Sequence, residues 1–106
     1  MDKLSDQCRE RLREIERKLS ESVVRLRDMG NDDIRIVGQV LMVKGTFGKN
    51  IADAANDPEC QRMLRDLEPK LGNAYSFRGP AIKLENIPDV LEMTLTEVRA
   101  ALYRHD

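Results

Sequence analysis

The segment "CRERLREIERKLSESVVRLRDM", residues 8–29, decides the fold class. Its less polar residues recur at alternating steps of four and three, which places their side chains along one face of an α-helix. The residues of this face, called the seam below, are Cys8, Leu12, Ile15, Leu19, Ser22, Leu26 and Met29. Charged residues fill most of the positions between them. The pattern therefore predicts one long, coiled-coil-like amphipathic helix over residues 3–29.

The seam also predicts self-association. A small domain has few apolar faces with which to cover a helix of this length, and a second copy of the same helix is an economical cover. We therefore expect a homodimer. Its predicted interface consists of Leu12, Ile15, Leu19, Ser22, Leu26 and Met29.

The rest of the chain also favours helices. Residues 34–43 are apolar nearly all round, which indicates a buried central element, and their β-branched residues leave a strand as the alternative to a helix. Within the central helical region, residues 32–71, a short helix is expected over residues 46–55 and another begins at Asp57 and Pro58.

The C-terminal part divides into a loop and a helix. Residues 72–88 are rich in Gly and Pro and predict a loop, and residues 88–104 predict an amphipathic helix. One face of that helix consists of Ile87, Leu91, Leu95, Val98 and Leu102. The predicted fold is a single all-α domain of four to five helices, with more than half of its residues helical.

Composition agrees with this class and narrows the partners. The 106 residues include 35% charged but only 4% aromatic residues, a balance typical of helical bundles. The 18 Lys and Arg against 19 Asp and Glu give a net charge of -1, so no overall field attracts nucleic acid or an anionic membrane.

The cysteines and the N-terminal segment indicate the cellular compartment of the protein. Cys8 and Cys60 are far apart in the sequence and form no metal-binding cluster, so we expect both to be reduced thiols. The N-terminal residues are charged, and no apolar run is long enough to cross a bilayer. The sequence thus predicts a cytoplasmic protein without a membrane span.

The segment "VKGTFGKNIADAANDPEC", residues 43–60, allows three interpretations. A phosphate-binding loop is disfavoured because Gly45 and Gly48 are too close together and Asn50 stands where a magnesium-binding hydroxyl is needed. A helix-turn-helix over residues 46–68 is the alternative that would bind DNA, although its second helix carries more acidic than basic residues. We favour a structural corner between helices, and no bound nucleotide.

Few residues indicate chemistry. The single histidine, His105, lies next to the C-terminus without a partner to orient it, so no catalytic residue, metal site or cofactor is predicted. Tyr75, Phe77 and Arg78 belong to residue types enriched at the centres of protein interfaces and form the predicted partner-binding patch.

The arginine-rich face of residues 8–27 resembles the first helix of the helical chorismate mutases, a likeness that covers about twenty residues. The resemblance implies that Arg9 would bind a substrate carboxylate, that Glu16 would match the motif's acidic residue, and that Lys44 or Lys49 would serve as the later active-site lysine. The sequence departs from that family where Leu26 replaces a second arginine.

The expected function is an intracellular protein–protein interaction module: an adaptor, an assembly factor or a small regulator. The alternatives are a helix-turn-helix DNA-binding regulator and a small mutase-type enzyme.

Overall fold

The computed structural model describes residues 4–29, 32–69 and 84–104 of the chain. Helices make up 89% of the described residues, and no strand occurs among them. The helices are α1 (Asp6–Met29), α2 (Asp33–Asp53), α3 (Pro58–Leu67) and α4 (Ile87–Arg104), with a 3-10 turn, η1 (Leu84–Asn86), before α4. The predicted all-α class is confirmed, as is a long N-terminal helix.

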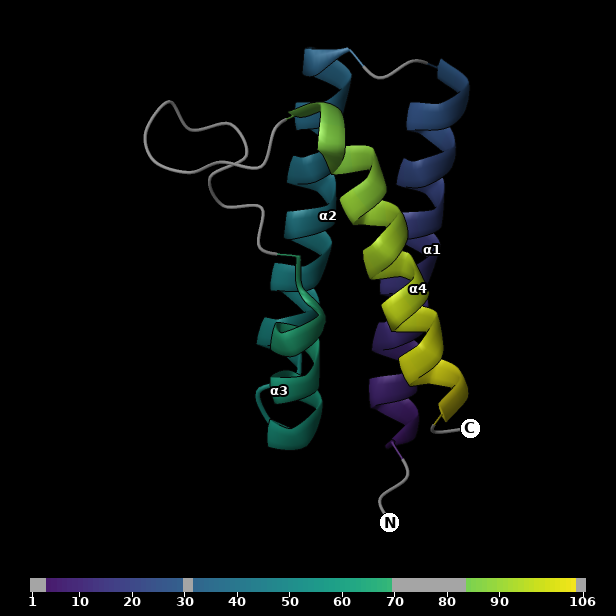
Figure 1. Cartoon of the computed structure of the whole chain (residues 1–106). Helices are drawn as coiled ribbons and strands as arrows, with labels where there is room; N and C mark the ends of the chain where they lie inside the picture. The colour runs from purple at the N-terminus through teal and green to yellow at the C-terminus, as the bar shows by residue number, and fades with distance from the viewer. Residues whose placement is uncertain (1–3, 30–31, 70–83, 105–106) are drawn as a thin grey trace.

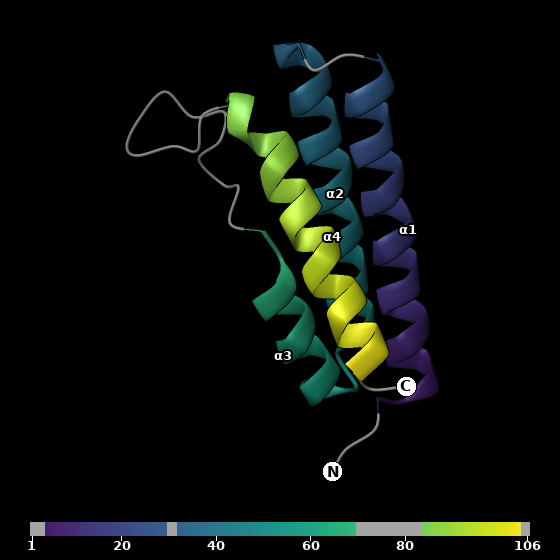
Figure 2. The same cartoon turned by 45° about the vertical axis from the view of Figure 1, so that its right-hand side comes forward.

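The helices α1 and α2 form an antiparallel pair, and α4 lies across it, antiparallel to α1 (Figures 1 and 2). The short α3 packs beside the C-terminal half of α2 (Figure 1). Apolar side chains from all four helices meet between these elements. Phe47 of α2 is the largest fully buried side chain, and Leu12 of α1 and Leu91 of α4 are equally inaccessible to solvent.

Two ion pairs join the facing edges of α1 and α4. Arg27 donates to the Glu92 carboxylate at 2.6 Å, and Arg99 donates to Glu16 at 3.1 Å. Glu16, in the N-terminal half of α1, meets Arg99, in the C-terminal half of α4, and Arg27 near the end of α1 meets Glu92 near the start of α4. Parallel helices would instead bring like charges together, so the charges match only when α1 and α4 run antiparallel. Exposed pairs of this kind contribute only about 0.2–1 kcal/mol each, so they select the orientation more than they stabilise the fold.

Helix α2 confirms one prediction and corrects two. Residues 34–43 are helical, as expected. The separate helix predicted over residues 46–55 was wrong, because Gly45 and Gly48 lie inside a single continuous helix. The prediction that residues 34–43 form a centrally buried element was also wrong: one face of α2 packs on the core, and Ile34 and Leu41 on the opposite face are exposed.

Helices α2 and α3 each begin at an aspartate cap. The Asp32 carboxylate accepts a hydrogen bond from the backbone N–H of Arg35 at 2.9 Å and so begins α2. The chain then turns at residues 54–57, and the Asp57 carboxylate accepts from the backbone N–H of Cys60 at 3.2 Å. Pro58 occupies the first turn of α3, where its missing N–H costs no hydrogen bond. The structural corner is therefore present, four residues long.

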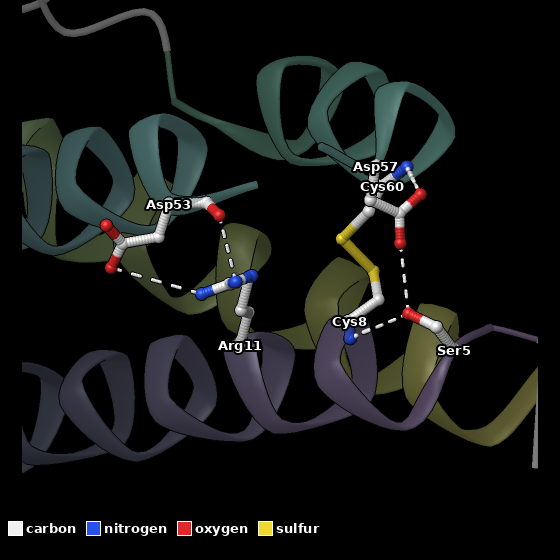
Figure 3. The surroundings of a disulfide bond; sticks show 6 residues. All are labelled: Ser5, Cys8, Arg11, Asp53, Asp57 and Cys60. Atoms are coloured by element: carbon white, nitrogen blue, oxygen red, sulfur yellow. Dashed lines mark hydrogen bonds and ion pairs between the residues drawn. A yellow bond between two sulfur atoms is a disulfide. The ribbon is translucent and has the colours of Figure 1, made fainter. Parts of the chain in front are cut away.

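The predicted reduced thiols were wrong, because Cys8 and Cys60 form a disulfide with a Cα–Cα distance of 5.8 Å (Figure 3). Each cysteine is the third residue of its helix. Its backbone N–H donates a hydrogen bond to the side chain that caps the N-terminus of the same helix. For Cys8 that side chain is Ser5, at 3.0 Å. Ser5 Oγ in turn donates to the Asp57 carboxylate at 3.0 Å, so the two helix caps are hydrogen-bonded to each other (Figure 3).

A third helix end joins this cluster. Arg11 of α1 donates to the backbone carbonyl of Asp53, the last residue of α2, at 2.9 Å, and its guanidinium lies 3.9 Å from the Asp53 carboxylate (Figure 3). The last turn of α2 contains no basic residue of its own. Arg11 therefore supplies the cation that satisfies an end carbonyl and complements the helix dipole.

Removing the disulfide should lower the free energy of unfolding. The bridge joins residues 52 positions apart, and a closed loop of that length constrains the unfolded chain by about 4 kcal/mol in the chain-entropy account. We expect Cys8→Ser/Cys60→Ser to lose about 2–4 kcal/mol in urea denaturation. A reductant should destabilise the wild type by a similar amount and leave the double variant unchanged. Equal stability of the wild type with and without reductant would contradict a stabilising disulfide.

Candidate functional site

The seam lies inside the single chain. Its members are buried against α2, α3 and α4, and those with described side chains are Cys8, Leu12, Ile15, Leu19, Ser22 and Leu26. The hydroxyl of Ser22 is also buried and has no hydrogen-bond partner among the described residues. The side chains expected to meet a second copy are thus already covered by the chain's own helices, and a dimer would need another surface.

Several predicted residues cannot be placed. Tyr75, Phe77, Arg78 and His105 lie outside the described residues, and so does the side chain of Met29. The predicted partner-binding patch therefore stays a prediction.

The residues implied by the mutase resemblance do not converge. Glu16 faces α4, where it pairs with Arg99. Lys49 reaches the opposite side of α1, where its Nζ lies 3.4 Å from the Glu14 carboxylate. Helix geometry places positions 14 and 16 on different faces of α1, so one substrate would not contact both sides. Arg9 forms an ion pair at 3.9 Å with Asp6, within its own helix.

The helix α3 offers a mixed surface to DNA. Its exposed residues include Glu59 and Asp66 together with Arg62 and Arg65. Acidic side chains beside the two arginines oppose the neutralisation of phosphates, from which affinity for a duplex chiefly comes. Its start is also fixed to α1 through Cys60.

An open groove of about 680 Å³ runs along α1 beside the C-terminal end of α2. Two of its three basic side chains contact carboxylates: Arg11 pairs with Asp53, and Arg13 donates to Glu10 at 3.0 Å. Among the described residues no His, Cys, Asp and Glu side chains cluster closely enough to hold a metal ion. The groove is thus lined by charges of both signs, and none of the described residues that line it carries a thiol, an imidazole or a hydroxyl group.

The outward face of α2 is the most distinctive surface. Six residues recur there at steps of four and three and fall within about 40° of one line along the helix. We call them the outer stripe: Ile34, Gly38, Leu41, Gly45, Gly48 and Ala52. All six are exposed, with Ile34 at 86% and Leu41 at 56%. The stripe lies directly opposite the face that is buried in the core.

Packing against the described residues does not explain the three glycines of the outer stripe. A Cβ atom built on Gly38, Gly45 or Gly48 would meet nothing within 4 Å. A glycine inside a helix costs roughly 0.5–1 kcal/mol relative to alanine. Gly38 therefore makes no close helix contact with the described residues. The three positions thus weaken α2 without serving the fold, while leaving a surface on which another backbone could approach closely.

No protein-family model, no curated protein and no solved structure matches the chain. The function must therefore be argued from the surface itself.

The sequence contained the signal for the outer stripe, since the steps of four and three are readable in residues 34–52. The stripe was missed for two reasons. The apolar residues on both faces suggested complete burial, and residues 46–55 were predicted to form a helix separate from residues 34–43. Only the packing of one face of α2 reveals that the other is free.

Truncating one leucine in the seam and one in the outer stripe should separate core from surface. Leu19 is 1% exposed, so Leu19→Ala should lower the free energy of unfolding by about 2–5 kcal/mol. Leu41→Ala should change it by less than about 0.5 kcal/mol. Urea denaturation of dilute protein measures both, and equal losses would contradict this assignment.

Gly45→Ala should stabilise the isolated chain by about 0.5–1 kcal/mol, because alanine loses less conformational freedom on folding and its Cβ has open space. Gly38→Ala should act in the same direction. Thermal denaturation at low protein concentration checks both, and a lowered midpoint would show that the glycines have a packing role.

Proposed function

We propose that the chain is a protein-binding module and that the outer stripe of α2 is its docking surface. The observation that carries this proposal is an exposed apolar face, five turns long, whose glycines cost stability that the fold does not recover. Continuous exposed apolar surface in a small domain is typical of interaction sites.

The shape of the stripe supports a helical partner. Ile34 and Leu41 project from it, whereas Gly38 between them and Gly45 and Gly48 beyond them have no side chain. Helices pack by inserting side chains of one into gaps of the other, and small residues allow the axes to come close. The half-buried side chains of Val37, Met42 and Ile51 widen the apolar band on either side.

The other functions have less support. The mutase residues lie on different sides of α1, and the exposed face of α3 is mixed in charge. A binding role, as an adaptor, assembly factor or small regulator, requires neither a catalytic group nor a basic surface.

The disulfide changes the expected location. Both cysteines are at most 2% exposed, so the bridge is protected and structural. Such bridges persist mainly in oxidising environments and are rare in the reducing cytosol. An oxidising compartment therefore fits the chain better than the cytoplasm expected from the sequence. No helix among the described residues is long and apolar enough to span a membrane.

Capture from an extract of the native host tests the docking surface. The chain is immobilised through its N-terminus under non-reducing conditions, and retained proteins are quantified by mass spectrometry. Leu41→Gln should lose the retained partner, because a polar amide replaces the apolar projection at the centre of the stripe. The matched control is Met93→Gln, since Met93 is 64% exposed on α4. Equal retention by wild type and Leu41→Gln would overturn the proposed function.

A further inference from the structure

We infer that the outer stripe binds a second copy of itself, so that two α2 helices pack antiparallel about a two-fold axis near residue 43. This inference rests on the proposed docking surface and names its occupant. It moves the expected homodimer from the seam, which is buried, to a face that is exposed.

The order of large and small residues along the stripe carries the inference. When two copies run antiparallel about position 43, Leu41 of each meets Gly45 of the other. The same register places Ile34 opposite Ala52, and Gly38 opposite Gly48. Both projecting side chains thus face small residues, and at the two glycine pairs the backbones can come together. A parallel arrangement would instead place Leu41 against Leu41 and Ile34 against Ile34, so that neither projecting side chain would face a small residue.

Isologous two-fold contacts of this kind are the commonest way in which identical chains associate. Here every contact between a large and a small residue occurs twice, once on each side of the axis. This arrangement explains why glycines occur on the stripe. A Cβ atom at Gly45, for example, would occupy the space that Leu41 of the other copy fills.

The size of the stripe sets the expected strength. From residue 34 to residue 52 it extends about 27 Å along the helix. One helix laid on another over that length buries roughly 500 Å² per copy, below the roughly 800 Å² of a standard stable interface. We therefore expect a reversible dimer with a micromolar dissociation constant rather than a permanent one.

The charges beside the stripe give the dimer a recognisable salt dependence. Arg35 is paired with Asp32 at 3.6 Å and Lys49 with Glu14 at 3.4 Å, so both are partly neutralised within each copy. Lys44 has no ion-pair partner among the described residues, and it lies beside the axis, where it approaches Lys44 of the other copy. Salt screens this repulsion and leaves apolar contact intact, so added salt should tighten the dimer. An acidic helical partner would show the opposite dependence.

Sedimentation equilibrium over micromolar to millimolar concentrations of the oxidised chain tests the inference. The wild type should dimerise, more tightly at high salt, and Lys44→Gln should dimerise more tightly at low salt. Leu41→Gln and Gly45→Gln should each weaken the dimer by at least roughly tenfold, with Met93→Gln unchanged. Gly45→Gln should remain at least as stable a monomer as the wild type, since glutamine is a good helix former, so its loss of dimer cannot be ascribed to unfolding.

A swap of the two central residues tests the register. Leu41→Gly alone and Gly45→Leu alone should both weaken the dimer, whereas the double variant should recover it, because the large residue again faces the small one across the axis. A double variant no better than the singles would overturn the antiparallel register. A wild type that stays monomeric at millimolar concentration would overturn self-binding altogether. The docking surface would survive that result if capture by the chain still depended on Leu41.

Discussion

The Cys8–Cys60 disulfide and its two hydrogen-bonded caps hold three helix ends at one point, and the arrangement of α1, α2 and α3 depends on them. With ten residues, α3 is too short to be a stable helix by itself. The disulfide that holds its first turn and the burial of Leu64 stabilise it. The same cluster receives the end of α2 through Arg11. Fixing one end of these helices leaves α4 to close the core along the length of α1.

Helix α2 then serves two purposes with two opposite faces. Its inner face supplies Val40, Val43 and Phe47 to the core, each at most 1% exposed. The glycines of the outer stripe make no close contact with the rest of the described structure, and they lower the helix propensity of α2. Because the buried side chains of α2 lie on the inner face, the outer stripe can be altered with little effect on the fold. This separation makes surface variants of α2 informative about binding.

Much of the architecture was predictable from periodicity. The steps of four and three in residues 8–29 and the apolar face from Ile87 to Leu102 locate α1 and α4, and the aspartate caps locate the starts of α2 and α3. Such patterns show that an apolar helix face will be buried, but not which element of the protein or of a partner packs against it. The seam therefore suggested a second copy, although α2 and α4 of the same chain fill that role.

Two other features needed three-dimensional information. The pairing of cysteines 52 residues apart follows from how α3 folds back on α1, which no local pattern encodes. The outer stripe could be recognised from the steps of four and three between its residues. Its exposure, however, depends on where α1, α3 and α4 pack around α2. The sequence thus allowed the residues of the candidate site to be recognised, but it did not reveal that their side chains are exposed.

The disulfide tethers α3 to α1. The protection of the α3 backbone amides from hydrogen exchange should therefore depend on whether this disulfide is intact. With the bridge intact, opening α3 requires its buried Leu64 to leave the core while the first turn stays attached. With the bridge cleaved, the whole segment can detach as one cooperative unit without disturbing the long contact between α1 and α4. Amide protons of α3 would then exchange earlier than those of α1, so their exchange rate reports whether the bridge is intact.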